Sequence, residues 1–280
     1  MIRKKWASVS LQAGRIIFLA IFLFIVLFPF YWQLLTSLKP TREITSLSLL
    51  PNWSTASLNA YRFIMTERPF LRYILNSVVV ALVTTAIAVT VSSMAAYALA
   101  RLNFRAKGAV LTAILAISMF PAISMISPIY LTISRLGLRN TWWGLIIPYL
   151  TFAMPLSVWY LTTFFKTIPY ELEEAAKTDG CSPLQALLLV IIPLVIPGTF
   201  TTAILIFIQA WNEYLFSLTI NTDDLFRTVT VGITMFQGEF TMPWVEQAAG
   251  IVTVTFPLAI VVFLLQRRII SGLTSGAVKG

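Results

Sequence analysis

The sequence predicts an all-α polytopic membrane protein with six transmembrane helices. Composition is the first reason, because 58% of the residues are hydrophobic, 11% are charged and the mean hydropathy is +0.84. A soluble domain carries about 25% charged residues, so this class is excluded. The second reason is a series of apolar runs long enough to cross a hydrocarbon core of roughly 30 Å. The third is that Lys and Arg cluster beside these runs, a pattern of membrane topology and not of nucleic-acid binding, despite the net charge of +9.

We expect one transmembrane domain over residues 1–280, because no internal repeat or domain boundary is visible. The first apolar run, Ile16 to Leu35, competes with a signal peptide, but it is too long and lacks an A-x-A cleavage site. It is therefore interpreted as an uncleaved span. The expected spans are residues 16–36, 74–100, 110–131, 142–165, 196–220 and 248–266.

The middle spans carry signs of helix packing. The second is rich in small and hydroxyl residues, such as Thr84 and Ser92, which let helices approach closely in a bilayer. Pro121 and Pro128 interrupt the third span. Such prolines mark a kink near a cavity or accompany ordinary kinked packing, and both interpretations remain open. Trp142 opens the fourth span as an interfacial anchor.

The basic residues orient the chain. With the N-terminus inside, cytoplasmic segments hold twelve of them: Arg3, Lys4, Lys5, Arg15, Arg101, Arg105, Lys107, Lys166, Lys177, Arg267, Arg268 and Lys279. The opposite face holds eight: Lys39, Arg42, Arg62, Arg68, Arg72, Arg135, Arg139 and Arg227. Because cytoplasmic loops carry the excess of Lys and Arg, both termini and residues 166–195 are expected in the cytoplasm.

The longest charged segment, residues 166–195, predicts two helices joined by a glycine. Its first helix opens with residues typical of a helix N-terminus: Pro169, Glu171, Glu173 and Glu174. Gly180 ends that helix. Ser182 and Gln185 then have the spacing of a capping box, and the second helix runs apolar up to Pro193.

This segment resembles the EAA loop of ABC importer permeases, through Glu174-Ala175-Ala176, then Gly180, then Pro193 after an apolar run. Val190 and Ile192 stand where the family pattern has Ile and Leu, which are conservative departures. The resemblance implies a type I ABC importer permease fold, in which this cytoplasmic loop docks into a groove on the ATPase subunit. It also implies a set of coupling residues: Glu171, Glu174, Ala175, Ala176, Asp179, Gly180 and Ser182.

Other segments resemble the carbohydrate-uptake branch of these permeases, with maltose- and trehalose-type importers as the nearest likeness. They are Ala95-Ala-Tyr-Ala-Leu-Ala-Arg101, Leu136-Gly-Leu-Arg-Asn-Thr141, Trp211-Asn-Glu-Tyr-Leu-Phe216 and Gly272-Leu-Thr-Ser-Gly-Ala-Val-Lys-Gly280. The resemblance implies a sister permease, two ATPase subunits and an extracytoplasmic sugar-binding protein in a bacterial or archaeal cytoplasmic (inner) membrane. The chain has no G-x-x-x-x-G-K-[ST] loop, so ATP and Mg²⁺ are expected on the partner ATPase and no cofactor in this chain.

Glu213 is the one ionisable side chain within an expected span. A charge in hydrocarbon costs about 2.5–3.5 kcal/mol, so the carboxylate must face protein or water. One interpretation places it on the translocation pathway with Trp211 and Asn212. The other has it reach from the outer end of the helix to the headgroups. Both are kept.

The resemblance implies two further contact regions. The external loop would reach the binding protein through Phe236, Gln237, Gly238 and Glu239. The tail would approach the ATPase pair through Ser271 and Lys279.

Two other classes of function are less well supported. A secondary transporter would show paired repeats and acids near the midplane. A membrane enzyme would need a catalytic constellation, and a chain without His and with one Cys excludes His/Cys metal sites. A non-enzymatic transport subunit is therefore expected. Which sugar it carries is not readable from the sequence, and glycerol phosphate or polyol importers share the same features.

Overall fold

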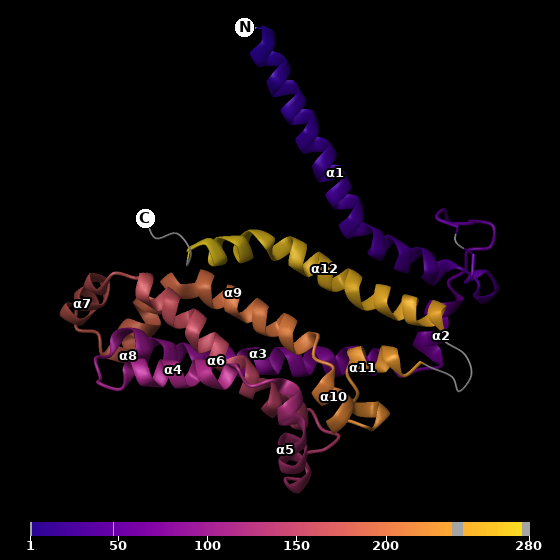
Figure 1. Ribbon diagram of the computed structural model, residues 1–280. Coiled ribbons are helices and arrows are strands. Elements are labelled where there is room, and N and C mark those ends of the chain that lie inside the picture. Colours follow the sequence, from indigo (N-terminus) through magenta and orange to yellow (C-terminus); the bar gives the residue numbers. More distant parts are fainter. Residues whose placement is uncertain (1, 47, 237–242, 276–280) are drawn as a thin grey trace. The chain divides into compact units, whose positions relative to one another are not determined.

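The computed structural model describes residues 2–46, 48–236 and 243–275, and every element in them is helical (Figure 1). The predicted all-α fold is confirmed. Five helical segments there are long and apolar enough to cross a membrane: Gly14–Leu38, Phe70–Arg101, Trp143–Thr167, Pro183–Trp211 and Trp244–Gln266. A sixth crossing is possible through a bent pair of helices, Lys107–Ser118 and Ala122–Arg135. Each expected span overlaps one of these segments.

The described chain divides into two compact units, Met1–Arg68 with Ile233–Pro257, and Pro69–Gly232 with Leu258–Gly280. The first unit contains α1 (Ile2–Leu38), η1 (Thr41–Glu43) and α2 (Asn59–Thr66). The loop after α1 is held by Lys39, whose Nζ donates to the carbonyl of Ser46 at 2.9 Å and lies 4.9 Å from the Trp32 ring centroid. The last helix is α12 (Trp244–Ser275), with Pro257 inside it.

The second unit is built on α3 (Phe70–Arg101), α6 (Trp143–Thr167) and α9 (Ile192–Trp211). These three helices meet at Ala88, Ala153 and Ile206. The helices α6 and α9 approach so closely at Gly198 that a Cβ atom there would overlap the ring of Phe164. Close approach through a residue without a side chain is a form of helix packing that suits a bilayer, where hydrophobicity does not drive helices together.

The third expected span is two helices, α4 (Lys107–Ser118) and α5 (Ala122–Arg135), which meet at an angle of 92°. The bend falls at Pro121, which lies before the first residue of α5 with an extended backbone of φ −66° and ψ 129°. Proline has no N–H to continue the α4 ladder, which accounts for the break. Pro128 is accommodated inside α5.

The fifth expected span is also divided. The helix α9 ends at Trp211, residues 212–214 are not α-helical, and the short α10 (Leu215–Ile220) follows. Beyond α10 lie η3 (Asp224–Phe226) and α11 (Val229–Thr234).

At the first residues of α3, a buried amide ties distant segments together. Asn76 donates to the carbonyls of Leu225 and Arg227, each at 2.9 Å, and accepts from Trp142 Nε1 at 2.9 Å. The neighbouring Ser77 hydroxyl accepts from the backbone N–H of Val229 at 2.9 Å. We call these five residues and Asn76 itself (Asn76, Ser77, Trp142, Leu225, Arg227 and Val229) the Asn76 network.

Candidate functional site

The charged segment folds as its local sequence predicts. The helix α7 (Tyr170–Thr178) begins after Pro169, with Glu171 and Glu173 in its first turn. Gly180 follows with φ +90°, a conformation that side chains with a Cβ rarely adopt. The helix α8 (Pro183–Ala186) then opens on the predicted capping box: Gln185 N–H donates to Ser182 Oγ at 3.3 Å, and Ser182 N–H donates to Gln185 Oε1 at 2.8 Å. The capping box is confirmed.

A π-helical turn, η2 (Leu187–Ile191), joins α8 to α9. Its widened ring is closed by the N–H of Ile192, which bonds to the carbonyl of Leu187 five residues earlier. Pro193 follows directly and lacks the N–H that would bond to Leu189, which accounts for the wide turn.

Most of the residues predicted to couple lie on the exposed side of this segment. Exposed are Glu171, Glu174, Ala175, Asp179, Gly180 and Ser182, whereas Ala176 is buried. Two large apolar side chains lie on the same two helices and are also exposed, Leu172 at 41% and Leu184 at 61%. The outer face of α7 and α8 therefore exposes acidic and large apolar side chains together.

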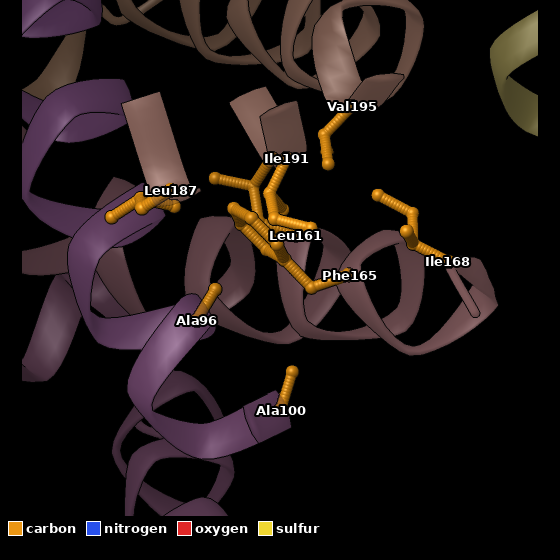
Figure 2. Close-up of a cluster of buried hydrophobic side chains, with 8 residues drawn as sticks. All are labelled: Ala96, Ala100, Leu161, Phe165, Ile168, Leu187, Ile191 and Val195. Carbon is orange, nitrogen blue, oxygen red and sulfur yellow. The ribbon is translucent and has the colours of Figure 1, made fainter. Parts of the chain in front are cut away.

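The inner side of the segment rests on a buried apolar cluster (Figure 2). In Figure 2 the side chains of Leu161, Phe165 and Ile191 meet at its centre. The full set comes from α3, α6 with the residue after it, η2 and α9: Ala96, Ala100, Leu161, Phe165, Ile168, Leu187, Ile191 and Val195. The cluster joins Ile168, which precedes α7, and η2, which follows α8, to α3, α6 and α9.

Beside this cluster lies a group of polar side chains that links α7 to the last turn of α3. The Arg101 side chain is 1% exposed, and its Nε lies 3.6 Å from Oε2 of Glu173. Arg101 Nη2 donates to the carbonyl of Ile168 at 2.8 Å, and the guanidinium lies 4.4 Å from the ring centroid of Tyr170. Glu173 Oε1 accepts from Tyr97 at 2.9 Å and from Lys177 at 2.9 Å. We call Tyr97, Arg101, Tyr170, Glu173 and Lys177 the Arg101 cluster.

Burial alone would raise the pKa of the Glu173 carboxyl, but its surroundings reverse that effect. The hydrogen bonds from Lys177 and Tyr97, and the positive charges of Lys177 and Arg101, hold the pKa below its ordinary value. Glu173 is therefore ionised at neutral pH.

Sequence reasoning missed Glu173 and Arg101 as site residues. A signal was present, because Glu173 lies three residues before Ala176 and shares its helix face. Once Ala176 is assigned to the buried side, Glu173 follows it there, whereas Glu174 turns outward.

The second candidate site surrounds Glu213, in the break between α9 and α10. Its carboxylate accepts the backbone N–H of Phe216 at 2.8 Å and of Ser217 at 3.2 Å, and the hydroxyl of Tyr149 at 2.6 Å. These bonds satisfy groups that the break leaves without helical partners. Of its two neighbours, Trp211 stacks on Phe207 with ring centroids 5.7 Å apart, and Asn212 is exposed, with Nδ2 2.8 Å from the carbonyl of Ile208.

Glu213 also lines a cavity of about 130 Å³ between α3, α5, α6, α9 and α10. The polar side chains on its wall are Thr84, Tyr149, Gln209 and Glu213, and Phe152 and Phe216 add aromatic rings. Within the described residues, Oγ1 of the fully buried Thr84 has no hydrogen-bond partner. A second cavity of about 160 Å³ shares Ala153, Ile206 and Gln209 with the first and continues along α6 and α9 to Tyr160 and Thr202.

Of the remaining predicted site residues, some lie within the described residues and others lie outside them. Phe236 is buried, with 4% of its surface exposed. Ser271 lies in the last turns of α12. Gln237, Gly238, Glu239 and Lys279 lie outside the described residues. In the part of the chain that the structure describes, no group of three His, Cys, Asp or Glu residues is placed to hold a metal ion.

Comparison with known proteins identifies the family of this chain. The family profile described as "Binding-protein-dependent transport system inner membrane component" matches residues 88–275. The chain belongs to this family. The matched region of this permease contains both the Arg101 cluster and the whole of residues 166–195.

Characterised relatives extend the likeness over most of the chain. The permease is 45% identical to the trehalose transport system permease protein SugB of Mycobacterium tuberculosis, over 91% of this chain and 93% of that one. It is 40% identical to the sulfoquinovosyl glycerol transport system permease protein SmoH of Agrobacterium fabrum, over 91% and 89%. Identity to the trehalose/maltose transport system permease protein MalG of Thermococcus litoralis is 39%, over 91% and 92%.

Among solved structures, a chain of a bacterial ABC transporter involved in the import of the acidic polysaccharide alginate superposes with a TM-score of 0.77. The match covers 93% of this permease and 97% of that chain, at 22% identity. The fold is therefore that of a type I ABC importer permease, and the protein is a multi-pass membrane protein.

Proposed function

We propose that this permease is one of two transmembrane subunits of an ATP-driven sugar importer and forms half of its translocation pathway. The observation that carries the proposal is the exposed acidic and apolar face of α7 and α8, on a base fixed to three long helices. A surface of this composition, outside the expected spans, supports contact with a protein partner. Relatives named for the transport of trehalose, maltose or sulfoquinovosyl glycerol support a sugar as the cargo.

The energy source lies on a partner. The chain has no phosphate-binding loop, so ATP and Mg²⁺ are expected on two ATPase subunits whose grooves receive α7. On this proposal Glu171, Glu174 and Asp179 face a basic groove rim, Ala175 permits close approach, and Gly180 and Ser182 shape the turn. Ala176, predicted as a further coupling residue, is buried and contributes on the inner side of α7. Both termini and residues 166–195 then lie in the cytoplasm of a bacterium or archaeon.

The pathway is proposed to run along the two cavities beside α6 and α9. Hydroxyl and amide groups there, from Tyr149, Gln209 and Tyr160, suit the hydroxyls of a sugar, and Phe152 suits its ring face. Glu213 contributes as a fixed acceptor at one end. Asn212 and Trp211 remain predicted neighbours of the pathway, Asn212 on its exposed side.

Contacts with the other partners follow from the family resemblance. The segment from Phe236 to Glu239 is proposed to meet the extracytoplasmic sugar-binding protein. The tail, including Ser271 and Lys279, is proposed to approach the ATPase pair.

Reconstitution tests the function. The affinity-tagged permease is purified from its native membrane, its co-purifying subunits are identified by mass spectrometry, and the complex is placed in proteoliposomes with labelled trehalose or maltose. We expect a sister permease and a P-loop ATPase to co-purify, and uptake that needs both ATP and the binding protein. Uptake driven by an ion gradient without ATP would instead identify a secondary transporter.

The single cysteine tests the orientation. Cys181 is partly exposed in the turn after α7, so an impermeant maleimide is expected to label it in inverted vesicles and not in intact cells. The matched control is Cys181→Ser with Asn52→Cys in the expected external loop, where residue 52 is exposed. This control is expected to label in intact cells, and labelling of Cys181 there would reverse the topology.

A further inference from the structure

The chain has covalent and non-covalent connections between the coupling segment and the bundle. Residues 168–169 join α6 directly to α7, and beyond α7 the chain runs through α8 and η2 into α9. It passes Gly180, the wide π-helical turn and Pro193, and α9 itself contains Pro197. Each of these features interrupts the regular α-helical hydrogen-bond pattern, so the connection from α7 to α9 can bend.

The non-covalent route crosses at the Arg101 cluster. Arg101 is the last residue of α3, and Glu173 is the fourth residue of α7. From Arg101 the helix α3 continues for 32 residues without a proline, whereas α6 contains Pro148 and Pro155. Among the three packed helices of this unit, α3 is thus the uninterrupted one.

At a rise of about 1.5 Å per residue, roughly 25 Å of continuous helix separates Arg101 from Thr84. Thr84 lines the cavity beside Glu213. A displacement of α7 that moves Arg101 would therefore be passed along the continuous helix α3 to Thr84 on the cavity wall.

The chemistry at the junction is unusual for a merely structural contact. The apolar cluster next to α7 contains no residue of α7 itself, so the contacts of Glu173 with Arg101 and Tyr97 are direct links between α7 and α3. Burying the Arg101 guanidinium until 1% of the side chain is exposed costs free energy. An ion pair offsets this cost only when its geometry is favourable, whereas apolar contacts depend little on direction. The buried ion pair therefore restricts the relative orientation of α7 and α3 in addition to holding them together.

The junction also keeps unused hydrogen-bonding capacity. Among the described residues, Arg101 Nε and Nη1 and Glu173 Oε2 have no hydrogen-bond partner. The closest approach between the charged groups is 3.6 Å, which is longer than a hydrogen bond. The two groups can therefore close on one another, or re-pair, as α7 moves, without leaving the buried site.

We propose that the Arg101–Glu173 pair transmits the movement of α7 to α3, so that these two are positioning residues for transport and α3 is the element that carries the motion to the cavity. The inference rests on the proposed function and extends it, since it names the helix that responds to the ATPase. It assigns no contact with ATP, ATPase or sugar to either residue.

The test uses the complete complex in proteoliposomes, with wild type, Glu173→Gln and Arg101→Met. Glu173→Gln preserves size and removes the charge. Both variants are expected to retain the ATPase subunits and to hydrolyse ATP, with sugar transported per ATP at least tenfold lower. The matched control is Arg105→Met, an exposed arginine four residues beyond Arg101, which is expected to transport as wild type does.

A covalent replacement separates transmission from stability. In a Cys181→Ser background, Arg101→Cys with Glu173→Cys is expected to transport poorly, and a short bifunctional maleimide across the two thiols is expected to restore the sugar-to-ATP ratio. Recovery of the sugar-to-ATP ratio on cross-linking supports a mechanical link between α7 and α3. The cross-link restores neither charge and is added to protein that has already folded. The single variants, treated with the same reagent, should not recover.

Two outcomes overturn the inference. One is an unchanged sugar-to-ATP ratio in Glu173→Gln. The other is loss of the ATPase subunits from the variant complex, which would make the pair a docking determinant. The proposed function fails separately, if the wild-type complex shows no ATP-dependent sugar uptake. Should Arg101→Met fail to accumulate, Glu173→Gln and the cross-linked pair decide the matter.

Discussion

The two ends of α3 are held in opposite ways. At its first turns the neutral amide of Asn76 uses both N–H donors and its carbonyl, all at 2.9 Å. At its last turn the charged Arg101 leaves two nitrogens without a hydrogen-bond partner among the described residues. A fully paired neutral network stabilises one arrangement, whereas a buried charge with spare donors tolerates several. The comparison indicates a fixed end and an adjustable end on the same helix.

The largest effect is expected at the fixed end. Asn76→Ala leaves the Trp142 N–H and the carbonyls of Leu225 and Arg227 without their partner, and should destabilise the protein by about 3 kcal/mol. Thermal unfolding of the detergent-solubilised permease would measure it. Asn103→Ala, at an exposed loop position, is the control and should change stability by less than about 0.5 kcal/mol. An equally small effect of Asn76→Ala would remove the distinction between the ends.

A smaller loss is expected at Gly180, beyond the adjustable end. Its φ of +90° disfavours any side chain, and a Cβ added there would meet no atom within 4 Å, so backbone strain alone should cost Gly180→Leu about 1–2 kcal/mol. Membrane insertion should be normal while sugar uptake falls, because the turn between α7 and α8 changes. Gly108→Leu, at an open site without a positive φ, is the matched control. Normal uptake and normal substrate-stimulated ATP hydrolysis in Gly180→Leu would contradict the coupling role of the turn.

At the adjustable end, stability and transport should separate. Arg101→Met combined with Glu173→Met replaces a buried ion pair by apolar side chains, a change that is often neutral or favourable, so unfolding should stay within about 1 kcal/mol of wild type. Transport should nevertheless fall, because the directional contact is lost. The measurement pairs thermal unfolding with uptake in proteoliposomes. A destabilisation as large as that of Asn76→Ala would show that the Arg101 cluster is a second fixed point.

The smallest effect is expected from pH. The folded-state pKa of Glu173 lies below the unfolded value of about 4.5, so its ionisation stabilises the protein above that pH. This contribution is lost as the pH falls from about 4.5 through the folded-state pKa. Glu173→Gln should therefore show a shallower loss of stability than wild type over this acidic range, in unfolding scans at a series of pH values. Parallel curves for the two proteins would mean that the carboxylate contributes nothing.

Features set by neighbouring residues could be predicted from the sequence. The capping box of Ser182 and Gln185 and the turn at Gly180 follow from spacing alone, because each involves atoms within one or two turns. The apolar runs likewise predict the spans, since length and composition suffice for a bilayer. Breaks inside those runs are harder to read. Trp211-Asn-Glu-Tyr214 has apolar residues on both sides, so the sequence predicts one continuous span there, although a carboxylate beside an amide is a sign of a helix end.

Contacts between distant segments could not be predicted. Tyr97 and Glu173 are 76 residues apart, and the spacing of Glu173 and Ala176 on one face of α7 does not indicate that this face meets α3. That contact depends on the rotation of α7 about its axis, which places Glu173 and Ala176 on the buried side. Glu174 was assigned to coupling through the family resemblance, whereas Glu173 acquires its role only from the packing of α3 against α7.

The absence of a side chain at Gly198 has a consequence for the cargo. Because a hydrogen is all that fits opposite the Phe164 ring, α6 and α9 are held closer together here than any larger residue would allow. These same helices form facing walls of both cavities. If the proposed pathway runs along these cavities, its width depends on Gly198, which lines neither of them, so a substitution there would change the width without changing the lining.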